Sequence, residues 1–179
     1  MLNFDRDVWV TTNSNKSFYL NKMNPENINI WDIHQGLSNI CRFAGQITPD
    51  YKVAQHCCIV SDYLPDEFKF EGLMHDAAEW VTGDIPKPIK WMIPEVAELE
   101  LFIYNQIAEV FKLPRIISLE VKKVDDRLLQ REALLMFDFV PDWVRDSNIK
   151  PLDIEIEEVW SAEKCRTEFM KRFMELAPK

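Results

Sequence analysis

Glycine and cysteine are scarce in this sequence, and each shortage excludes a class of protein. Only four Gly occur in 179 residues, whereas all-β folds rich in hairpins need glycine at many tight turns. The four Cys lie at positions 41, 57, 58 and 165, and no two of them form a Cys-x-x-Cys pair. This spacing fits neither a disulfide framework nor a zinc–thiolate site. It favours reduced, mostly buried thiols in a cytosolic protein.

Positive charge and long apolar runs are also in short supply. Lys and Arg number 21 against 30 Asp and Glu, and the net charge of −9 disfavours binding to a nucleic-acid backbone. No run approaches the ~20 apolar residues of a membrane span. The opening MLNFDRDVWV lacks the basic start and long apolar stretch of a signal peptide. We therefore expect a cytoplasmic protein with neither a nucleic-acid nor a membrane partner.

Helical periodicity dominates the hydrophobic residues, which make up 47% of the chain. Residues 8–21 contain two β-prone runs around Asn-Ser-Asn-Lys and predict a short hairpin. Apolar stripes at helical spacing then predict helices within residues 28–43, 51–64, 64–83, 94–113, 117–137 and 156–176. The chain is thus predicted to be one all-α domain, a bundle of about six helices. It spans residues 1–179, with an N-terminal hairpin extension at 1–22 and a C-terminal connection and helix at 138–179.

Three of the predicted helices carry imidazole and carboxylate groups on inward-facing positions. His56 lies on the apolar face of its helix, His75 and Asp76 lie on the next helix with Glu79 one turn later, and Asp125 lies on the stripe of the 117–137 helix. Buried carboxylates need a neutralising partner. Two His and two carboxylates with open positions for water suit Zn, Mn, Co, Ni or Fe. Glu79 would then take or relay a proton of the water.

Simpler interpretations remain open at this point. A His-Asp dipeptide is common, and a buried pair of this kind is often only a satisfied part of the core. Asp126 falls on the wet side of its helix and is expected in a surface ion pair of little energy. Arg42 is either a cation that complements a helix dipole or a bidentate phosphate clamp. Lys87 is a solvated charge or a phosphate contact, Asp84 caps a turn or accepts from a substrate hydroxyl, and His34 is a core or pocket-edge residue.

The order His, His-Asp, Asp on successive helices resembles the signature of the HD-domain phosphohydrolases. The segments VAQH, HDAAEWVTGDIPKPIK and KKVDDRLLQREA resemble those of bacterial HD-domain 5′-deoxynucleotidases. The stretch SFYLNKMNPENINIWDIHQGLSNICRFAG resembles small phage-type HD proteins that include dATP triphosphohydrolases. The resemblance covers roughly residues 8–137. It implies an HD-domain helical bundle that works in the cytosol of a bacterium or of a phage-infected host.

The resemblance also implies a set of site residues. His56, His75, Asp76 and Asp125 would hold a divalent transition metal, Co, Mn, Zn or Ni, and Glu79 would handle the nucleophilic water. The remaining substrate contacts are implied to be Arg42 on the scissile phosphate with Phe43 beside it, Asp84 facing the sugar, and Lys87 on phosphate oxygens.

Base recognition is implied to come from residues just after the hairpin. Phe18, Tyr19 and Leu20 stand nearest that place, where an aromatic ring would stack on a purine or else fill the core. Two positions depart from the family pattern: Gln46 stands where many relatives have His, and His34 lies one position before the expected His. Any role of those family histidines with phosphates is altered or lost here.

Taken together, the residues and the resemblance predict a metal-dependent phosphohydrolase that converts dATP and water to deoxyadenosine and triphosphate. Activated water would attack the phosphorus next to the 5′ oxygen, and additional Mg²⁺ would neutralise the triphosphate. The alternative substrate is a deoxynucleoside monophosphate. A rival of another class is a non-catalytic nucleotide sensor, which would have lost a metal ligand or Glu79. The resemblance further implies a homo-oligomer.

Overall fold

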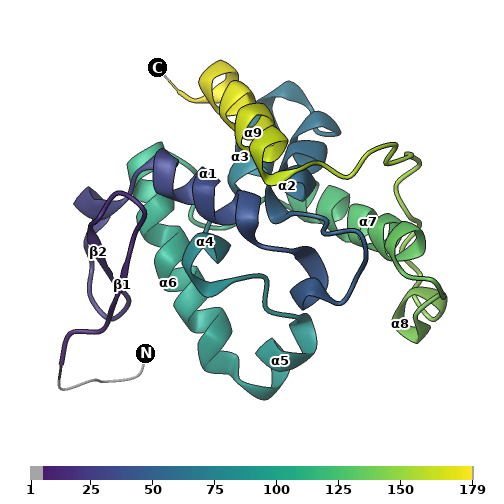
Figure 1. Cartoon of the computed structure of the whole chain (residues 1–179), viewed down its shortest axis with the longest axis horizontal. Coiled ribbons are helices and arrows are strands. Elements are labelled where there is room, and N and C mark those ends of the chain that lie inside the picture. The colour runs from purple at the N-terminus through teal and green to yellow at the C-terminus, as the bar shows by residue number, and fades with distance from the viewer. Residues whose placement is uncertain (1–5, 179) are drawn as a thin grey trace.

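The computed structural model describes residues 6–178, so the ends of the predicted hairpin extension (1–5) and of the C-terminal segment (179) lie outside it. The described chain is mostly helical, with a two-stranded antiparallel hairpin near its start (Figure 1). The predicted fold class, all-α with a small N-terminal β-hairpin, is confirmed. The elements are β1 (Trp9–Thr11), β2 (Ser17–Tyr19), η1 (Pro25–Asn27), α1 (Ile30–Asn39), η2 (Arg42–Gly45), α2 (Val53–Asp62), α3 (Asp66–Met74), α4 (Glu79–Thr82), α5 (Lys87–Met92), α6 (Pro94–Phe111), α7 (Leu119–Met136), α8 (Asp142–Arg145) and α9 (Ala162–Leu176).

Several helices begin where local sequence signals place their starts. The Asn29 side chain caps α1 by accepting from the backbone N–H of Asp32. Ser118 caps α7 in the same way, and Pro94 occupies the first turn of α6, as the sequence predicts. The longer helices α1, α2, α3, α6, α7 and α9 each have nine or more residues and correspond to the predicted six. None of the helices in the described part of the chain is long and apolar enough to cross a membrane.

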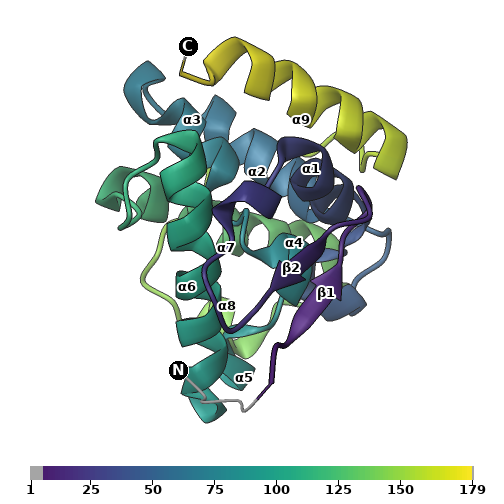
Figure 2. The same cartoon turned by 90° about the vertical axis from the view of Figure 1, so that its left-hand side faces the viewer.

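Helix α2 is the centre of the bundle. It packs against α1, α3, α7 and α9, and Figure 2 shows α9 lying across the end of the bundle formed by α1, α2 and α3. Val53, Cys57 and Val60 on α2 are fully buried. Because α2 is enclosed on all of these sides, a polar side chain on it must find its partners inside the protein. His56 is such a residue, because its side chain is fully buried.

The helix predicted over residues 64–83 is not continuous. Helix α3 ends at Met74, residues 75–78 form tight turns, and α4 begins at Glu79. The ring nitrogen Nδ1 of His75 lies 2.8 Å from the carbonyl oxygen of Gly72, which in a regular helix would accept from the backbone N–H of Asp76. The imidazole therefore competes for this carbonyl, and the chain tightens where the predicted metal ligands occur.

The last helix is also shorter than the prediction of 156–176. Helix α9 begins at Ala162 after Ser161, whose side chain caps it. The residues before it are held in an extended form by Gln55 of α2, which donates to the Glu158 carbonyl at 2.8 Å and accepts from the Trp160 N–H at 2.8 Å. Both ends of one buried amide thus bind this segment, and the tertiary contact overrides the helical pattern.

Candidate metal centre

Four side chains from three parts of the fold converge on one point. His56 comes from α2, His75 and Asp76 from the turn after α3, and Asp125 from α7. His56 Nε2 lies 3.1 Å from Asp125 Oδ1 and 3.3 Å from His75 Nε2. His75 Nε2 lies 3.2 Å from Asp76 Oδ2 and 3.8 Å from Asp125 Oδ1. The structure therefore brings together the four residues that the sequence proposed as metal ligands.

Three of these four separations match those between donor atoms around a single divalent ion. Ligands at about 2.1 Å from one ion lie about 3.0–3.4 Å from each other. His56 Nδ1 lies 2.6 Å from a Glu132 oxygen, and His75 Nδ1 lies 2.8 Å from the Gly72 carbonyl. These acceptors hold a proton on Nδ1 of each imidazole, so in the neutral, ligating form of the two rings the Nε2 lone pairs face each other. A cation between them relieves their repulsion, and the donor set fits a divalent transition metal.

The charges around this point are arranged to hold a cation. Burial by itself would raise the pKa values of Asp76 and Asp125, but His75 and His56 lower both below the usual range. Burial lowers the pKa of His75, yet the negative charge of Asp76 raises it well above its usual value. The two carboxylates are therefore ionised at neutral pH and available as ligands.

A sulfur ligand is a poor alternative in this cluster. The Cys57 thiol lies within 4.8 Å of ligand atoms of His75 and Asp76. Burial raises the pKa of this thiol to about 11, whereas metal binding needs the thiolate. The imidazole–carboxylate set is the better match.

Glu79 stands beside the cluster at the start of α4. Its side chain is buried, and its Oε2 atom has no hydrogen-bond partner within residues 6–178. Burial, with the negative charges of Asp76 and Asp84, raises the pKa of this carboxyl well above its usual value. A buried carboxyl with a raised pKa and a free oxygen is suited to exchange protons with a reactant.

Arg42 lies in η2, beyond the end of α1, and is buried. Its guanidinium lies 3.3 Å from a Glu132 oxygen and 3.6 Å from oxygens of both Asp76 and Asp84. The helix-dipole role considered for Arg42 therefore does not describe its position. Phe43, the next residue, has a φ of 55°, and its N–H donates to Asp84 at 2.7 Å. Asp84 thus stabilises a turn with left-handed backbone, a conformation that residues other than glycine seldom adopt. This turn positions Arg42 beside the cluster.

Glu132 is the main residue of the site that the sequence analysis missed. It is fully buried on α7 and accepts from His56, from the Tyr51 hydroxyl at 2.8 Å and from Arg42. Burial alone would raise the pKa of its carboxyl, but the charges of His56 and Arg42 lower it. Glu132 follows Asp125 by seven residues, which is two helical turns. The helical phase of Asp125 therefore contained the signal that finds Glu132.

Comparison with known proteins identifies relatives of this chain, but their names state no activity. No family model matches the chain. The curated Escherichia coli (strain K12) protein named "Uncharacterized protein YfdR" is 44% identical over 124 residues, which are 69% of this chain and 70% of that protein. The chain belongs to the YfdR family. The "Uncharacterized protein RCAP_rcc00048" of Rhodobacter capsulatus is 31% identical over 109 residues, or 55% of this chain and 56% of that protein.

In this member of the YfdR family, a cleft lies beside the candidate metal centre and is lined by three of its four residues. It has a volume of about 310 Å³. Asp126 pairs with Lys87 at 3.1 Å on the rim, and both are partly exposed, as expected for a surface ion pair. Lys122 adds a second cation. The lining residues are His75, Asp76, Lys87, Ile117, Val121, Lys122, Asp125 and Asp126.

The residues proposed to read the base are not brought to this cleft. Phe18 is fully buried, and its ring lies 5.2 Å from that of Trp80, while the Tyr19 ring lies 6.1 Å from that of Trp9 on the neighbouring strand. Leu20 packs against the core. None of Phe18, Tyr19 and Leu20 is among the cleft-lining residues. Phe18 instead fills the core, which is the alternative that the sequence left open.

The remaining candidates lie at the edges of the site. The Phe43 ring packs edge-on against Phe137 at 5.3 Å. Gln46 is exposed after η2. His34 is buried on α1, where its Nδ1 lies 2.7 Å from the Trp31 carbonyl. This backbone contact gives His34 a structural partner and agrees with leaving it out of the metal set.

Proposed function

We propose that this protein is a metal-dependent phosphohydrolase of deoxynucleotides, with dATP as the first candidate substrate. One observation carries the proposal: the Nε2 atoms of His56 and His75 face each other at 3.3 Å beside two ionised carboxylates. Three of the ligand residues, His75, Asp76 and Asp125, also line the cleft. A site of this kind leaves coordination positions for water and substrate, whereas a structural metal site is closed.

The chemistry follows from the residues around the ligands. When bound, a divalent metal such as Co, Mn, Zn or Ni lowers the pKa of coordinated water and polarises a phosphoryl oxygen. The free oxygen of Glu79 and its raised pKa suit this carboxyl for moving a proton between the attacking water and the leaving 5′ oxygen. Taking the proton from the water and giving it to the leaving oxygen therefore need no titratable group besides Glu79.

Fixed positive charge is available where negative charge would develop. The Arg42 guanidinium lies among Glu132, Asp76 and Asp84 at 3.3–3.6 Å and forms no shorter ion pair within residues 6–178. A phosphate oxygen approaching Asp76 and its metal therefore meets a preorganised cation. Lys87 and Lys122 extend this positive character along the cleft.

The size of the cleft favours a compact substrate and supports a second candidate. Its volume of about 310 Å³ is near the lower end of the about 300–1,000 Å³ typical of small-molecule sites. A deoxynucleoside monophosphate, hydrolysed to nucleoside and phosphate, is therefore the alternative substrate. A triphosphate would bring more negative charge, for which additional Mg²⁺ would compensate.

Product analysis tests the proposal directly. The full chain is loaded with Mn²⁺ or Co²⁺ and incubated with dNTPs, dNMPs and the matching ribonucleotides, and the products are separated by chromatography. Deoxyadenosine and triphosphate from dATP would support the first candidate, and nucleoside and phosphate from dNMPs the second. If a folded, metal-loaded protein turns over none of them, the proposed function is wrong.

A further inference from the structure

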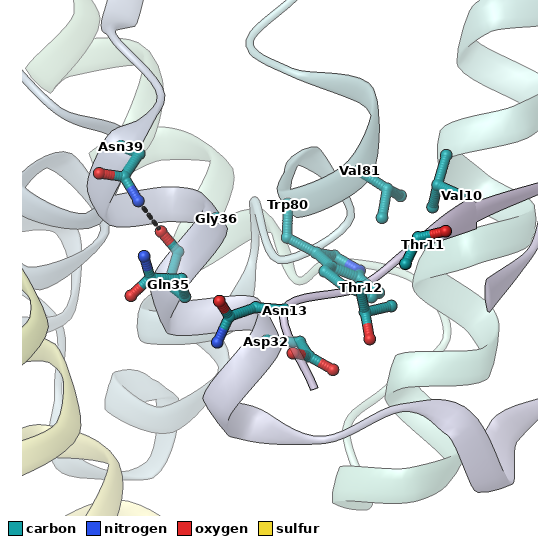
Figure 3. A pocket seen from close by; sticks show the side chains of 10 residues that line it. All are labelled: Val10, Thr11, Thr12, Asn13, Asp32, Gln35, Gly36, Asn39, Trp80 and Val81. Carbon is teal, nitrogen blue, oxygen red and sulfur yellow. Dashed lines mark hydrogen bonds between the residues drawn. The ribbon is translucent and has the colours of Figure 1, made fainter. Parts of the chain in front are cut away.

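A second cleft, of about 240 Å³, lies between β1, α1 and α4 (Figure 3). It shares no lining residue with the cleft beside the metal centre. The two helices approach closely here because Gly36 of α1 has no side chain: a Cβ at this position would lie 2.8 Å from the Trp80 carbonyl oxygen. The packing of α1 on α4 therefore forms one wall of this cleft, and the hairpin forms the other.

Trp80 contributes an unpaired polar atom to this cleft. Its side chain is only 8% exposed, and its Nε1 finds no acceptor within residues 6–178. A buried indole N–H normally has a hydrogen-bond partner. Figure 3 shows the indole between the side chains of β1 and those of α1. The wall of the cleft thus contains a mostly buried indole whose N–H donor lacks an acceptor within residues 6–178.

Apart from Asp32, the other polar side chains of the cleft carry neutral amides and hydroxyls. They belong to Thr11, Asn13, Gln35 and Asn39, which are among the residues that line the cleft (Figure 3). The Asn39 amide donates to the Gln35 backbone carbonyl at 2.7 Å, while the Gln35 side chain makes no hydrogen bond with other residues of the described chain. Amide groups of this kind offer a donor and an acceptor side by side.

The charges of the cleft exclude a phosphate as its ligand. No Lys, Arg or His occurs among the lining residues. The one acid, Asp32, accepts from the Ser14 backbone at 2.8 Å, from the Ser14 hydroxyl at 2.6 Å and from the Asn29 amide at 2.6 Å. Because Asp32 is occupied by these bonds and no cation is at hand, the cleft suits an uncharged ligand with a flat, hydrogen-bonding edge.

We propose that this cleft binds an uncharged nucleobase or nucleoside, at a site separate from the metal centre. Asn and Gln pair with base edges through two parallel hydrogen bonds, and bases stack on aromatic side chains. The volume of about 240 Å³ is below the about 300–1,000 Å³ usual for larger ligands, which matches a base. The proposal rests on the groups of this cleft and holds whether or not the protein is a phosphohydrolase.

The indole N–H signals of the six Trp residues provide the test. They are recorded by NMR on the ¹⁵N-labelled full chain during titration with deoxyadenosine, and the variant Trp80→Phe assigns the Trp80 signal. We expect deoxyadenosine to shift this signal downfield as its N–H gains an acceptor, and deoxyribose 5-phosphate, which has no base, to leave it in place. The proposal is overturned if deoxyadenosine and thymidine both leave the signal unchanged up to their solubility.

Two variants and one further ligand make the test specific. Gln35→Ala should weaken deoxyadenosine binding about fivefold, the effect of one lost hydrogen bond. The matched control Asn148→Ala, which removes an exposed amide outside the cleft, should leave binding unchanged. Equal affinity in both variants would refute the assignment. If dAMP shifts the Trp80 signal at lower concentration than deoxyadenosine, and Asp125→Ala removes that advantage, the cleft is part of the catalytic site and the separate site is disproved.

Discussion

Glu132 and His56 lie 2.6 Å apart, from a carboxylate oxygen to Nδ1, and both side chains are fully buried. This contact fixes the proton of His56 on Nδ1 and turns its Nε2 lone pair toward the other three ligands. The same carboxylate also accepts from Tyr51 and from Arg42. One residue therefore orients a candidate metal ligand and holds the cation expected to meet phosphate.

Glu132→Gln should weaken metal binding about 10- to 100-fold, because the amide presents an N–H₂ group to donors that now meet a carboxylate. Titration of the metal-free protein with Co²⁺ or Mn²⁺ by calorimetry measures this change. Glu120→Gln, on an exposed position of the same helix, is the control and should bind as the wild type does. Equal affinity in the two variants would show that Glu132 does not orient His56.

Asp125 and Asp126 are neighbours with different environments, so they form a matched pair of variants. Asp125 lies 3.1 Å from His56, whereas Asp126 pairs with Lys87 on the rim. Asp125→Ala should lower metal affinity by more than the about 10- to 100-fold cost of losing an outer partner, and hydrolysis should be lost. Asp126→Ala should retain the metal. Elemental analysis after gel filtration decides, and a metal-free Asp126→Ala protein would contradict the assigned helix phase.

Glu79→Gln should separate binding from turnover. The amide keeps the shape of the side chain but cannot exchange a proton, so hydrolysis should fall about 10²- to 10⁴-fold. Nucleotide affinity and metal content should remain close to those of the wild type, since Glu79 is not one of the four converging ligands. Single-turnover kinetics and calorimetry measure the two effects. Wild-type rates in this variant would remove Glu79 from the mechanism.

The sequence predicts the fold well where the signals are local. The Ser118 cap, Pro94 and the hairpin within residues 8–21 are confirmed because each depends on a few neighbouring residues. Predictions over residues 64–83 and 156–176 are wrong in detail because distant or side-chain contacts decide them. The imidazole of His75 competes for a helical carbonyl, and Gln55 holds the segment before α9 extended.

The candidate site follows the same division. Helical phase alone selects Asp125 over Asp126, and the structure places these two residues accordingly. Arg42 could not be placed in this way, since it reaches the cluster through a turn with left-handed backbone at Phe43 and Ala44. Glu132 shares the inward helical phase of Asp125, but nothing local in the sequence identifies the donors that its carboxylate meets. Its partners Tyr51 and His56 lie some 80 residues earlier in the chain.

Variants of Phe18 and Tyr19 distinguish a role of these residues in the core from a role in base recognition. Phe18 is fully buried against Trp80, so Phe18→Ala should lower the free energy of unfolding by about 3–5 kcal/mol. Tyr19→Ala loses a cross-strand contact with Trp9 and should cost about 0.2–1 kcal/mol. Urea unfolding followed by circular dichroism gives both values. A Phe18→Ala protein as stable as wild type, with altered base preference, would restore Phe18 to the substrate site.

Asp32 gives a stability that depends on pH. Burial would raise the pKa of its carboxyl, but hydrogen bonds from Ser14 and Asn29 lower it below the usual value. Because the folded form has the lower pKa, the stabilisation is fully present above about pH 4, the ordinary range of an unfolded Asp. It is lost as the pH falls through the folded pKa.

Asp32→Asn should therefore lower the free energy of unfolding by about 1 kcal/mol at pH 7, the typical net effect of a lost hydrogen bond. The difference from wild type should shrink toward pH 3, and urea unfolding at both pH values tests it. A difference that stays constant across this range would show that the charge of Asp32 does not stabilise the junction between the hairpin and α1.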